Sequence, residues 1–153
     1  MRHRRAHMAI PEIRTRNLQR MVSVNAVDLE EFARRAVRYC LQIRKRTATN
    51  LTKLHQIFIY LVSDRRMSSL HRQFLGQSGP TDVLTFQHGE IFISVETARL
   101  HARRFGNSLA QELRLYVVHG LLHLHGFSER GKSETRKMEM TQQRILQGAG
   151  RLN

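Results

Sequence analysis

The stretch 109–125 constrains the fold of this chain more than any other segment. It runs for seventeen residues with Gly120 as its one helix-breaking residue. Ser108, directly before the stretch, and Gln111, within its first turn, have the spacing of a capping box, which favours a helix start at this point. Because apolar side chains occur on nearly every side of the expected helix, it must be buried on nearly every side. We therefore expect a long central helix with Gly126 as its C-cap.

Shorter elements surround this helix in the sequence. Asp28, followed by Glu31, is the expected N-cap of the first helix. Alternating or β-branched runs predict strands, and a 3.6-residue apolar period predicts helices. The predicted strands are 12–18, 56–62, 81–86 and 90–94, with a loop at 76–80 and a hairpin turn at 87–89, and the other predicted helices are 28–45, 64–74, 95–105 and 133–147. Short strands and covering helices predict an α+β fold: a small mixed sheet covered by helices, with the buried helix at its centre.

Composition limits the classes of protein that this chain can belong to. Its 153 residues, 41% of them apolar, suit one domain over residues 11–153 preceded by a basic, flexible arm over residues 1–10. A single cysteine, Cys40, excludes an internal disulfide and lies in an apolar helical pattern that predicts burial. No segment has the length of a membrane span or the apolar core of a signal peptide, so we expect a cytoplasmic protein with no membrane partner.

The net charge of +14 is large for this length. Such a surface attracts polyanions through phosphate neutralisation and counterion release. A solvated basic surface without a partner is the alternative. We expect nucleic acid as the partner, because no basic amphipathic helix stands apart from the fold to bind a membrane.

Two histidines on the central helix predict a metal site. His119 and His123 are four residues apart, which places both imidazoles on one helix face. Gly126 then allows a sharp turn, and Glu129 follows. Two helical ligands, a glycine turn and one returning ligand is the pattern by which metzincin proteases bind zinc. Two histidines and one carboxylate leave a coordination position open, which is typical of a catalytic zinc. The alternative is a pair of buried core histidines whose ring nitrogens are hydrogen-bonded and bind no metal.

The same segment argues against proteolysis. Zincin proteases have a glutamate directly after the first histidine as general base. Here that position is Gly120. We therefore expect one zinc ion that serves a reaction other than peptide hydrolysis.

Two motifs resemble the YbeY endoribonucleases of ribosomal RNA maturation. The segment His-Gly-Leu-Leu-His-Leu-His-Gly-Phe at 119–127 resembles that family's H-G-x-L-H-L-x-G-Y segment, and Pro-Thr-Asp-Val-Leu-Thr-Phe at 80–86 resembles its P-T-D-V-L-S-F strand. Gly-Glu-Ile at 89–91, with Ile-Ser at 93–94, is similar to its G-D-I-x-I-S segment. The resemblance covers about 57–140, with the motifs in the family's order.

This resemblance implies a zinc-dependent endoribonuclease that prefers single strands. It also implies ribosomal RNA or the small ribosomal subunit as partner, and no organic cofactor. Zinc-bound water and a ribose 2′-hydroxyl both remain candidates for the attacking group. The alternative hypotheses are a basic RNA-binding assembly factor with a structural zinc, and a metallohydrolase with another substrate.

The chain departs from the family at two positions. The family's third metal ligand is a histidine, and the matching position is Glu129, which is also a competent zinc ligand. The family's catalytic arginine corresponds to Leu75, and Arg72 is the nearest arginine upstream. We predict Arg72 as the catalytic residue, since a guanidinium can neutralise a phosphodiester in its transition state. An ordinary surface arginine is the alternative.

Other residues near the motifs have open roles. His125 is two helical steps past His123 and is expected to face away from the metal. His88 lies in the hairpin turn and is a lesser candidate for facing it. Asp82 either orders a loop or orients a metal-ligating histidine. Glu112 and Tyr116, on the same helix face as His119, are expected to line the pocket.

Overall fold

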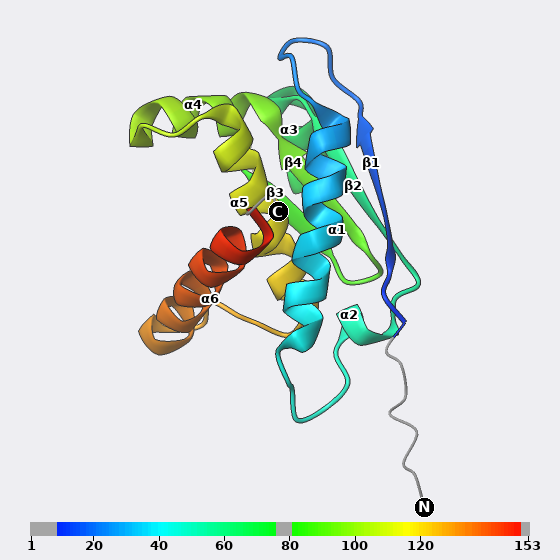
Figure 1. Ribbon diagram of the computed structural model, residues 1–153. Coiled ribbons are helices and arrows are strands. Elements are labelled where there is room, and N and C mark those ends of the chain that lie inside the picture. Colours follow the sequence, from blue (N-terminus) through cyan, green and yellow to red (C-terminus); the bar gives the residue numbers. More distant parts are fainter. Residues whose placement is uncertain (1–8, 76–80, 151–153) are drawn as a thin grey trace, which may run out of the picture.

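The computed structural model describes residues 9–75 and 81–150, and its four strands form one mixed sheet (Figure 1). The strand order is β1-β2-β4-β3. The strands are β1 (Glu12–Asn17), β2 (Gln56–Val62), β3 (Val83–Phe86) and β4 (Glu90–Ser94). β1, β2 and β4 are parallel, whereas β3 pairs antiparallel with β4 as the predicted hairpin.

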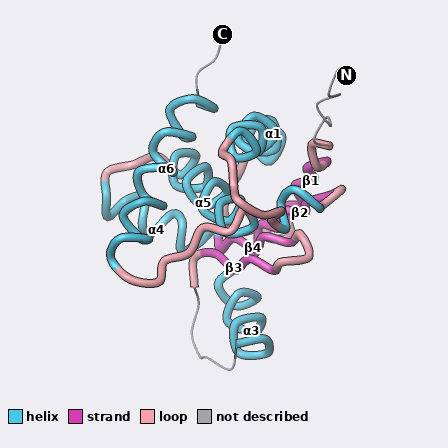
Figure 2. The backbone as a smooth tube through the Cα atoms, turned by 90° about the horizontal axis from the view of Figure 1, so that it is seen from below, coloured by secondary structure: helices cyan, strands magenta, loops and turns pink. Residues whose placement is uncertain are grey.

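Six helices cover the sheet unequally. They are α1 (Ala26–Gln42), α2 (Asn50–Lys53), α3 (Asp64–Leu75), α4 (Val95–Phe105), α5 (Leu109–Leu124) and α6 (Lys132–Gly150). Figure 2 shows α1, α4, α5 and α6 on one side of the sheet and α3 on the other. The α+β prediction, with a mixed sheet and a buried central helix, is confirmed.

The alternating side chains of β2 supply both faces of the sheet. Ile57, Ile59 and Leu61 are fully buried in the main core, under α1 and α5. Burying one such side chain stabilises the fold by about 1.5–3 kcal/mol. The side chains between them, among them Phe58 and Tyr60, point to the opposite face, because successive residues of a strand alternate.

Gly120 lets α5 approach β4 unusually closely. A Cβ atom built on Gly120 would lie 2.9 Å from both Cδ1 and Cγ2 of Ile91, which is itself fully buried. A side chain at this position would require either Ile91 or the helix to shift. The close packing therefore leaves no room for the glutamate that zincin proteases have at this position.

Several element boundaries differ from the sequence predictions: β3 begins at Val83 rather than 81, and β1, α3 and α5 each end one residue away from the predicted position. The expectation that Asp28 caps α1 is wrong: the Asn25 side chain accepts the Asp28 N–H at 3.1 Å, so the helix begins one turn earlier and ends at Gln42 rather than Lys45. The four-residue helix α2 was not predicted, and α6 extends to Gly150. The predicted loop at 76–80 and most of the predicted arm at 1–10 lie outside the described residues.

Two expectations from composition can be compared with the structure. Cys40 is fully buried, and burial raises the pKa of its thiol to about 12, so it is a core residue rather than a reactive thiol. No helix within 9–75 or 81–150 has the length and apolar character needed to cross a bilayer. The division into one domain and an arm stays a prediction.

Candidate metal centre

The C-terminal end of α5 is shaped by a Schellman motif. The Phe127 N–H donates to the Leu122 carbonyl at 3.0 Å, and the Gly126 N–H donates to the His123 carbonyl at 3.1 Å. Gly126 has a φ of 84°, a left-handed conformation that glycine adopts without steric cost. This turn reverses the chain and brings Glu129 back beside the last turn of the helix.

Three potential ligand atoms meet at this point. The Nε2 atoms of His119 and His123 lie 3.1 Å apart, and each lies 3.1 Å from Oε1 of Glu129. Zinc bonds to nitrogen and oxygen are about 2.0–2.1 Å, so tetrahedral ligand atoms lie about 3.3 Å apart. The three side chains are therefore spaced to hold one metal ion.

The outer nitrogens of both rings fix how the inner nitrogens face the cluster. Nδ1 of His119 donates to Oε1 of Gln142 at 2.7 Å, and Nδ1 of His123 donates to the carbonyl of Phe127 at 3.1 Å. In a neutral ring with this orientation, Nε2 presents a lone pair to the other ring and to the Glu129 carboxylate. A cation between three such electron-pair donors would stabilise their arrangement. Two imidazoles and a carboxylate suit a divalent ion such as zinc.

The cluster is open to solvent on one side. The side chains of His119 and His123 are each 28% exposed, and that of Glu129 is 46% exposed. Structural zinc sites are closed by four protein ligands, whereas this cluster offers three. Within the described ranges it is the one group of three or more His, Cys, Asp or Glu side chains with such spacing. A substrate can reach it directly.

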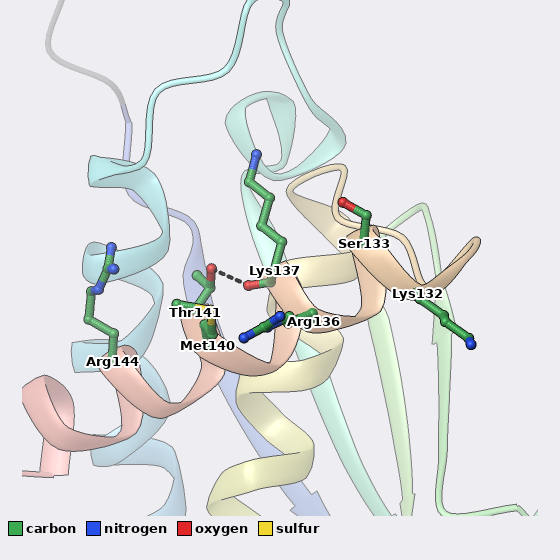
Figure 3. A pocket seen from close by; sticks show the side chains of 7 residues that line it. All are labelled: Lys132, Ser133, Arg136, Lys137, Met140, Thr141 and Arg144. Atoms are coloured by element: carbon green, nitrogen blue, oxygen red, sulfur yellow. Dashed lines mark hydrogen bonds between the residues drawn. The ribbon is translucent and has the colours of Figure 1, made fainter.

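A basic groove lies along α6, the helix that follows Glu129 (Figure 3). Its volume is about 520 Å³. Seven side chains line it: Lys132, Ser133, Arg136, Lys137, Met140, Thr141 and Arg144. The same helix supplies Gln142 to the metal cluster, so cluster and groove share one rigid element.

Another lysine lies beside the loop that carries the cluster. The Lys45 ammonium lies 3.7 Å from the centre of the Phe127 ring. Burial lowers the pKa of Lys45, and the nearby charge of Lys137 lowers it further. Positive charge therefore extends from the groove to the residue that orients His123.

His125 faces away from the cluster, as the helical geometry predicts. It is 1% exposed, its Nε2–H donates to the Ile43 carbonyl at 2.8 Å, and its Nδ1 accepts from the Thr49 hydroxyl at 2.8 Å. Burial lowers the pKa of this imidazole. His125 thus ties the end of α5 to the segment between α1 and α2, and it has no free nitrogen for a metal.

Two other candidates lie elsewhere. Arg72 is exposed on α3, which packs on the sheet face opposite α5, and its catalytic role stays a prediction. Leu75 ends the same helix and is 53% exposed. His88 is exposed and pairs with Glu90 rather than with the cluster.

The acidic residues near the motifs support local structure. Asp82 accepts the Val83 N–H at 2.8 Å, so it orders the start of β3, while Gln142 and Phe127 orient the two cluster histidines. Tyr116 is buried and its hydroxyl is 2.8 Å from Nδ1 of His101. Burial raises the pKa of Tyr116, with further contributions from the charges of Asp82 and Glu112.

Sequence reasoning missed the two groups that orient the cluster. The Phe127 acceptor is a backbone carbonyl, which carries no residue-type signal. Gln142 lies 23 residues from its partner His119. A glutamine on the apolar face of the last predicted helix was the available signal, since a buried amide needs a hydrogen-bond partner.

Fold and site together define an α+β protein with an open two-histidine, one-carboxylate cluster at the end of a buried helix. The family model described as "Endoribonuclease YbeY" matches residues 14–150, so the chain belongs to the YbeY family. The resemblance inferred from the sequence motifs is thereby confirmed.

Individual relatives agree with this assignment. The Endoribonuclease YbeY of Bacteroides thetaiotaomicron is 33% identical over 101 residues, which is 61% of this chain and 74% of the relative. That of Moorella thermoacetica is 35% identical over 114 residues, or 62% of this chain and 73% of the relative. The solution structure of TM1509 from Thermotoga maritima has a TM-score of 0.57 and 25% identity, and covers 92% of this chain and 97% of that one.

Proposed function

We propose that this protein is a zinc-dependent endoribonuclease that cuts single-stranded segments of ribosomal RNA during ribosome maturation in the cytoplasm. His119, His123 and Glu129 would hold one zinc ion. The observation that carries the proposal is the meeting of three potential ligand atoms, each 3.1 Å from the other two, at a solvent-exposed point. The relatives' name, endoribonuclease, supports RNA as the substrate.

The chain's own residues would contribute binding and orientation. A zinc ion in this cluster supplies Lewis acidity towards a phosphodiester. Gln142 and the Phe127 carbonyl keep both Nε2 atoms directed at the cluster. The basic groove along α6 binds backbone phosphates next to it. A flexible single strand can present one phosphodiester to the cluster, whereas a stacked duplex holds its backbone rigidly.

Arg72 is the proposed arginine of the reaction. Arg72 lies on α3, on the sheet face opposite α5, so this role requires α3 to move towards the cluster when RNA is bound, where the guanidinium would neutralise the transition-state charge. We expect Arg72→Gln to reduce kcat while the metal content stays at the level of the unaltered protein. Equal kcat in both proteins would remove Arg72 from the mechanism.

The central test is cleavage of single-stranded RNA by the purified protein. Activity should disappear with chelator, return when zinc is added, and be absent from a His119→Ala, His123→Ala double variant. Cleavage that is insensitive to chelator would exclude the metal mechanism.

A basic RNA-binding assembly factor with a structural zinc is the second candidate. The family's catalytic arginine is replaced by Leu75, which favours this candidate, whereas the open, three-ligand cluster favours the enzyme. Complementation of a strain that lacks the protein separates them. Full complementation by the double histidine variant would favour the assembly factor.

A further inference from the structure

The sheet face opposite α5 carries a continuous row of aromatic rings. The rings of Phe58 and Tyr60 are 5.8 Å apart and nearly parallel at 9°. Tyr60 stacks on Phe92 at 4.9 Å, and Phe92 meets Phe86 edge-on at 5.6 Å. We call these four residues, which come from three strands, the aromatic face.

This face is only partly covered. Within the described part of the chain, α3 is the one helix on this side, and its Met67 packs with Val62 and Leu84 (Figure 2). Phe58 and Tyr60 remain half-buried. A pocket of about 370 Å³ opens over their two rings, with His55 and His88 at its margin.

Arginines border the aromatic face along β1. The parallel register pairs Arg14 with Phe58 and Arg16 with Tyr60. Residues paired in this way point to the same side of a sheet, so both exposed arginines lie beside the rings. Arg14 pairs with Glu12, whereas Arg16 has no ion-pair partner among the described residues.

The helix on this side of the sheet is also basic. α3 contains Arg65, Arg66 and Arg72, and its one acidic residue is Asp64. Asp64 accepts the hydroxyl hydrogen bonds of Ser94 and Thr97, so its charge is directed towards α4. The acidic residue on the aromatic face itself, Glu90, pairs with His88.

We propose that the aromatic face is a second RNA-binding site, at which bases of a single strand stack on Phe58 and Tyr60. The phosphates would follow the arginines of β1. Partly exposed aromatic rings beside cationic side chains are the combination that single-stranded nucleic acids recognise. A protein partner could also use aromatic rings and arginines, so the tests below separate it from RNA. The site lies across the sheet from the metal cluster and needs no metal.

The direct test replaces the rings while keeping apolar side chains. In chelator, binding of a labelled single-stranded RNA 12-mer to a Phe58→Leu, Tyr60→Leu variant is measured by fluorescence anisotropy. We expect the variant to bind about tenfold more weakly, since stacking on an aromatic ring contributes much of the affinity for a single strand. Phe105→Leu removes an aromatic ring that is 66% exposed on α4 and is the matched control, expected to bind as the unaltered protein does.

The contribution of Arg14 and Arg16 is tested by the salt dependence of RNA binding. For single strands, each neutralised phosphate contributes about 0.7 to the slope of log K against log salt, so Arg14→Gln with Arg16→Gln should lower that slope by up to about 1.4. Arg103→Gln with Arg104→Gln, on α4, is the charge-matched control. An equal change in both pairs would overturn the proposed border.

A measurement on the unaltered protein completes the test. Ultraviolet crosslinking to single-stranded RNA, in chelator, should give adducts on Phe58 or Tyr60. Binding by the Phe58→Leu, Tyr60→Leu variant that equals the Phe105→Leu control, with no crosslink on β2, would overturn the proposal and favour a protein partner for this face. Because these experiments measure RNA binding and not cleavage, a negative result would reject the second binding site without rejecting the proposed nuclease activity.

Discussion

At the scale of single residues, the metal cluster depends on partners that are not ligands. His119 is oriented by a side chain from another helix, and His123 by a carbonyl of its own following loop. The first contact can be removed by substitution, whereas the second cannot. The two histidines therefore differ in how a mutation can disturb them.

Gln142→Leu should weaken metal binding without removing a ligand. Loss of the acceptor leaves the Nδ1–H of His119 without its partner and lets the ring turn. Loss of such a partner typically costs about 10–100-fold in metal affinity. Zinc titration with a competing chelator measures this, and Gln143→Leu, at the exposed neighbouring position, is the control. Equal affinity in both variants would show that Gln142 does not orient the ring.

Glu129→Gln should lower metal affinity by more than Gln142→Leu does. The amide keeps the size of the side chain but removes the charge that attracts a divalent ion. Elemental analysis after dialysis should find zinc in the unaltered protein and in an exposed control, Glu139→Gln, and little in Glu129→Gln. Equal zinc in all three would mean that Glu129 is not a ligand.

Much of the cluster could be predicted from spacing alone. The i, i+4 histidines, the glycine turn and the returning carboxylate are local features, and the three residues do lie together. The contact between Gln142 and His119 joins two helices, so it depends on how α6 packs against α5. A single sequence does not carry that packing.

At the scale of elements, the approach of α5 to β4 determines where the cluster lies. The helix lies close to the sheet because Gly120 has no side chain, and its C-terminal turn projects the histidines beyond the core. A substitution at Gly120 therefore tests whether the packing of α5 against β4 positions the cluster, without changing any of its three potential ligands.

Gly120→Ala should destabilise the fold by about 1–2 kcal/mol. Overpacking a well-filled core costs about 1–3 kcal/mol, and the higher helix propensity of alanine offsets up to about 1 kcal/mol. Urea denaturation measures the loss. Ile91→Val removes one of the contacting methyl groups, so the double variant should be more stable than the sum of the single effects predicts. Strict additivity would contradict a clash between these two residues.

Element types were better predicted than element ends. β2 and β4 have the predicted bounds, because their apolar runs are short and sharply delimited. The start of α1 was misplaced because Asn25 and Asp28 are both good caps, and only the hydrogen bond from the Asp28 N–H decides between them. α2 escaped prediction because four residues show no helical period.

At the scale of the whole molecule, composition predicts a strong attraction to polyanions but not where they bind. The net charge of +14 is spread along the chain. Folding gathers part of it along α6, beside the metal cluster. This arrangement depends on which face of α6 packs against α5, so it required the structure.

Arg136→Gln with Arg144→Gln should weaken RNA binding at low salt and lower the slope of log K against log salt by up to about 1.4. Both arginines line the groove, and among the described residues neither forms a hydrogen bond with the metal cluster. Zinc content should be unchanged. An unaltered salt slope would show that RNA does not follow this groove.

Because successive side chains of β2 alternate between the two faces of the sheet, mutations at neighbouring positions affect different properties of the protein. Substitutions at 57, 59 and 61 act on the buried side, where they reduce the population of folded molecules. Substitutions at 58 and 60 act on the side with the aromatic face, where they would alter RNA affinity in molecules that still fold. Tolerance to mutation along this strand should therefore alternate with a period of two. A measurement of protein abundance would detect the substitutions at 57, 59 and 61, whereas a measurement of RNA binding by the folded protein would detect those at 58 and 60.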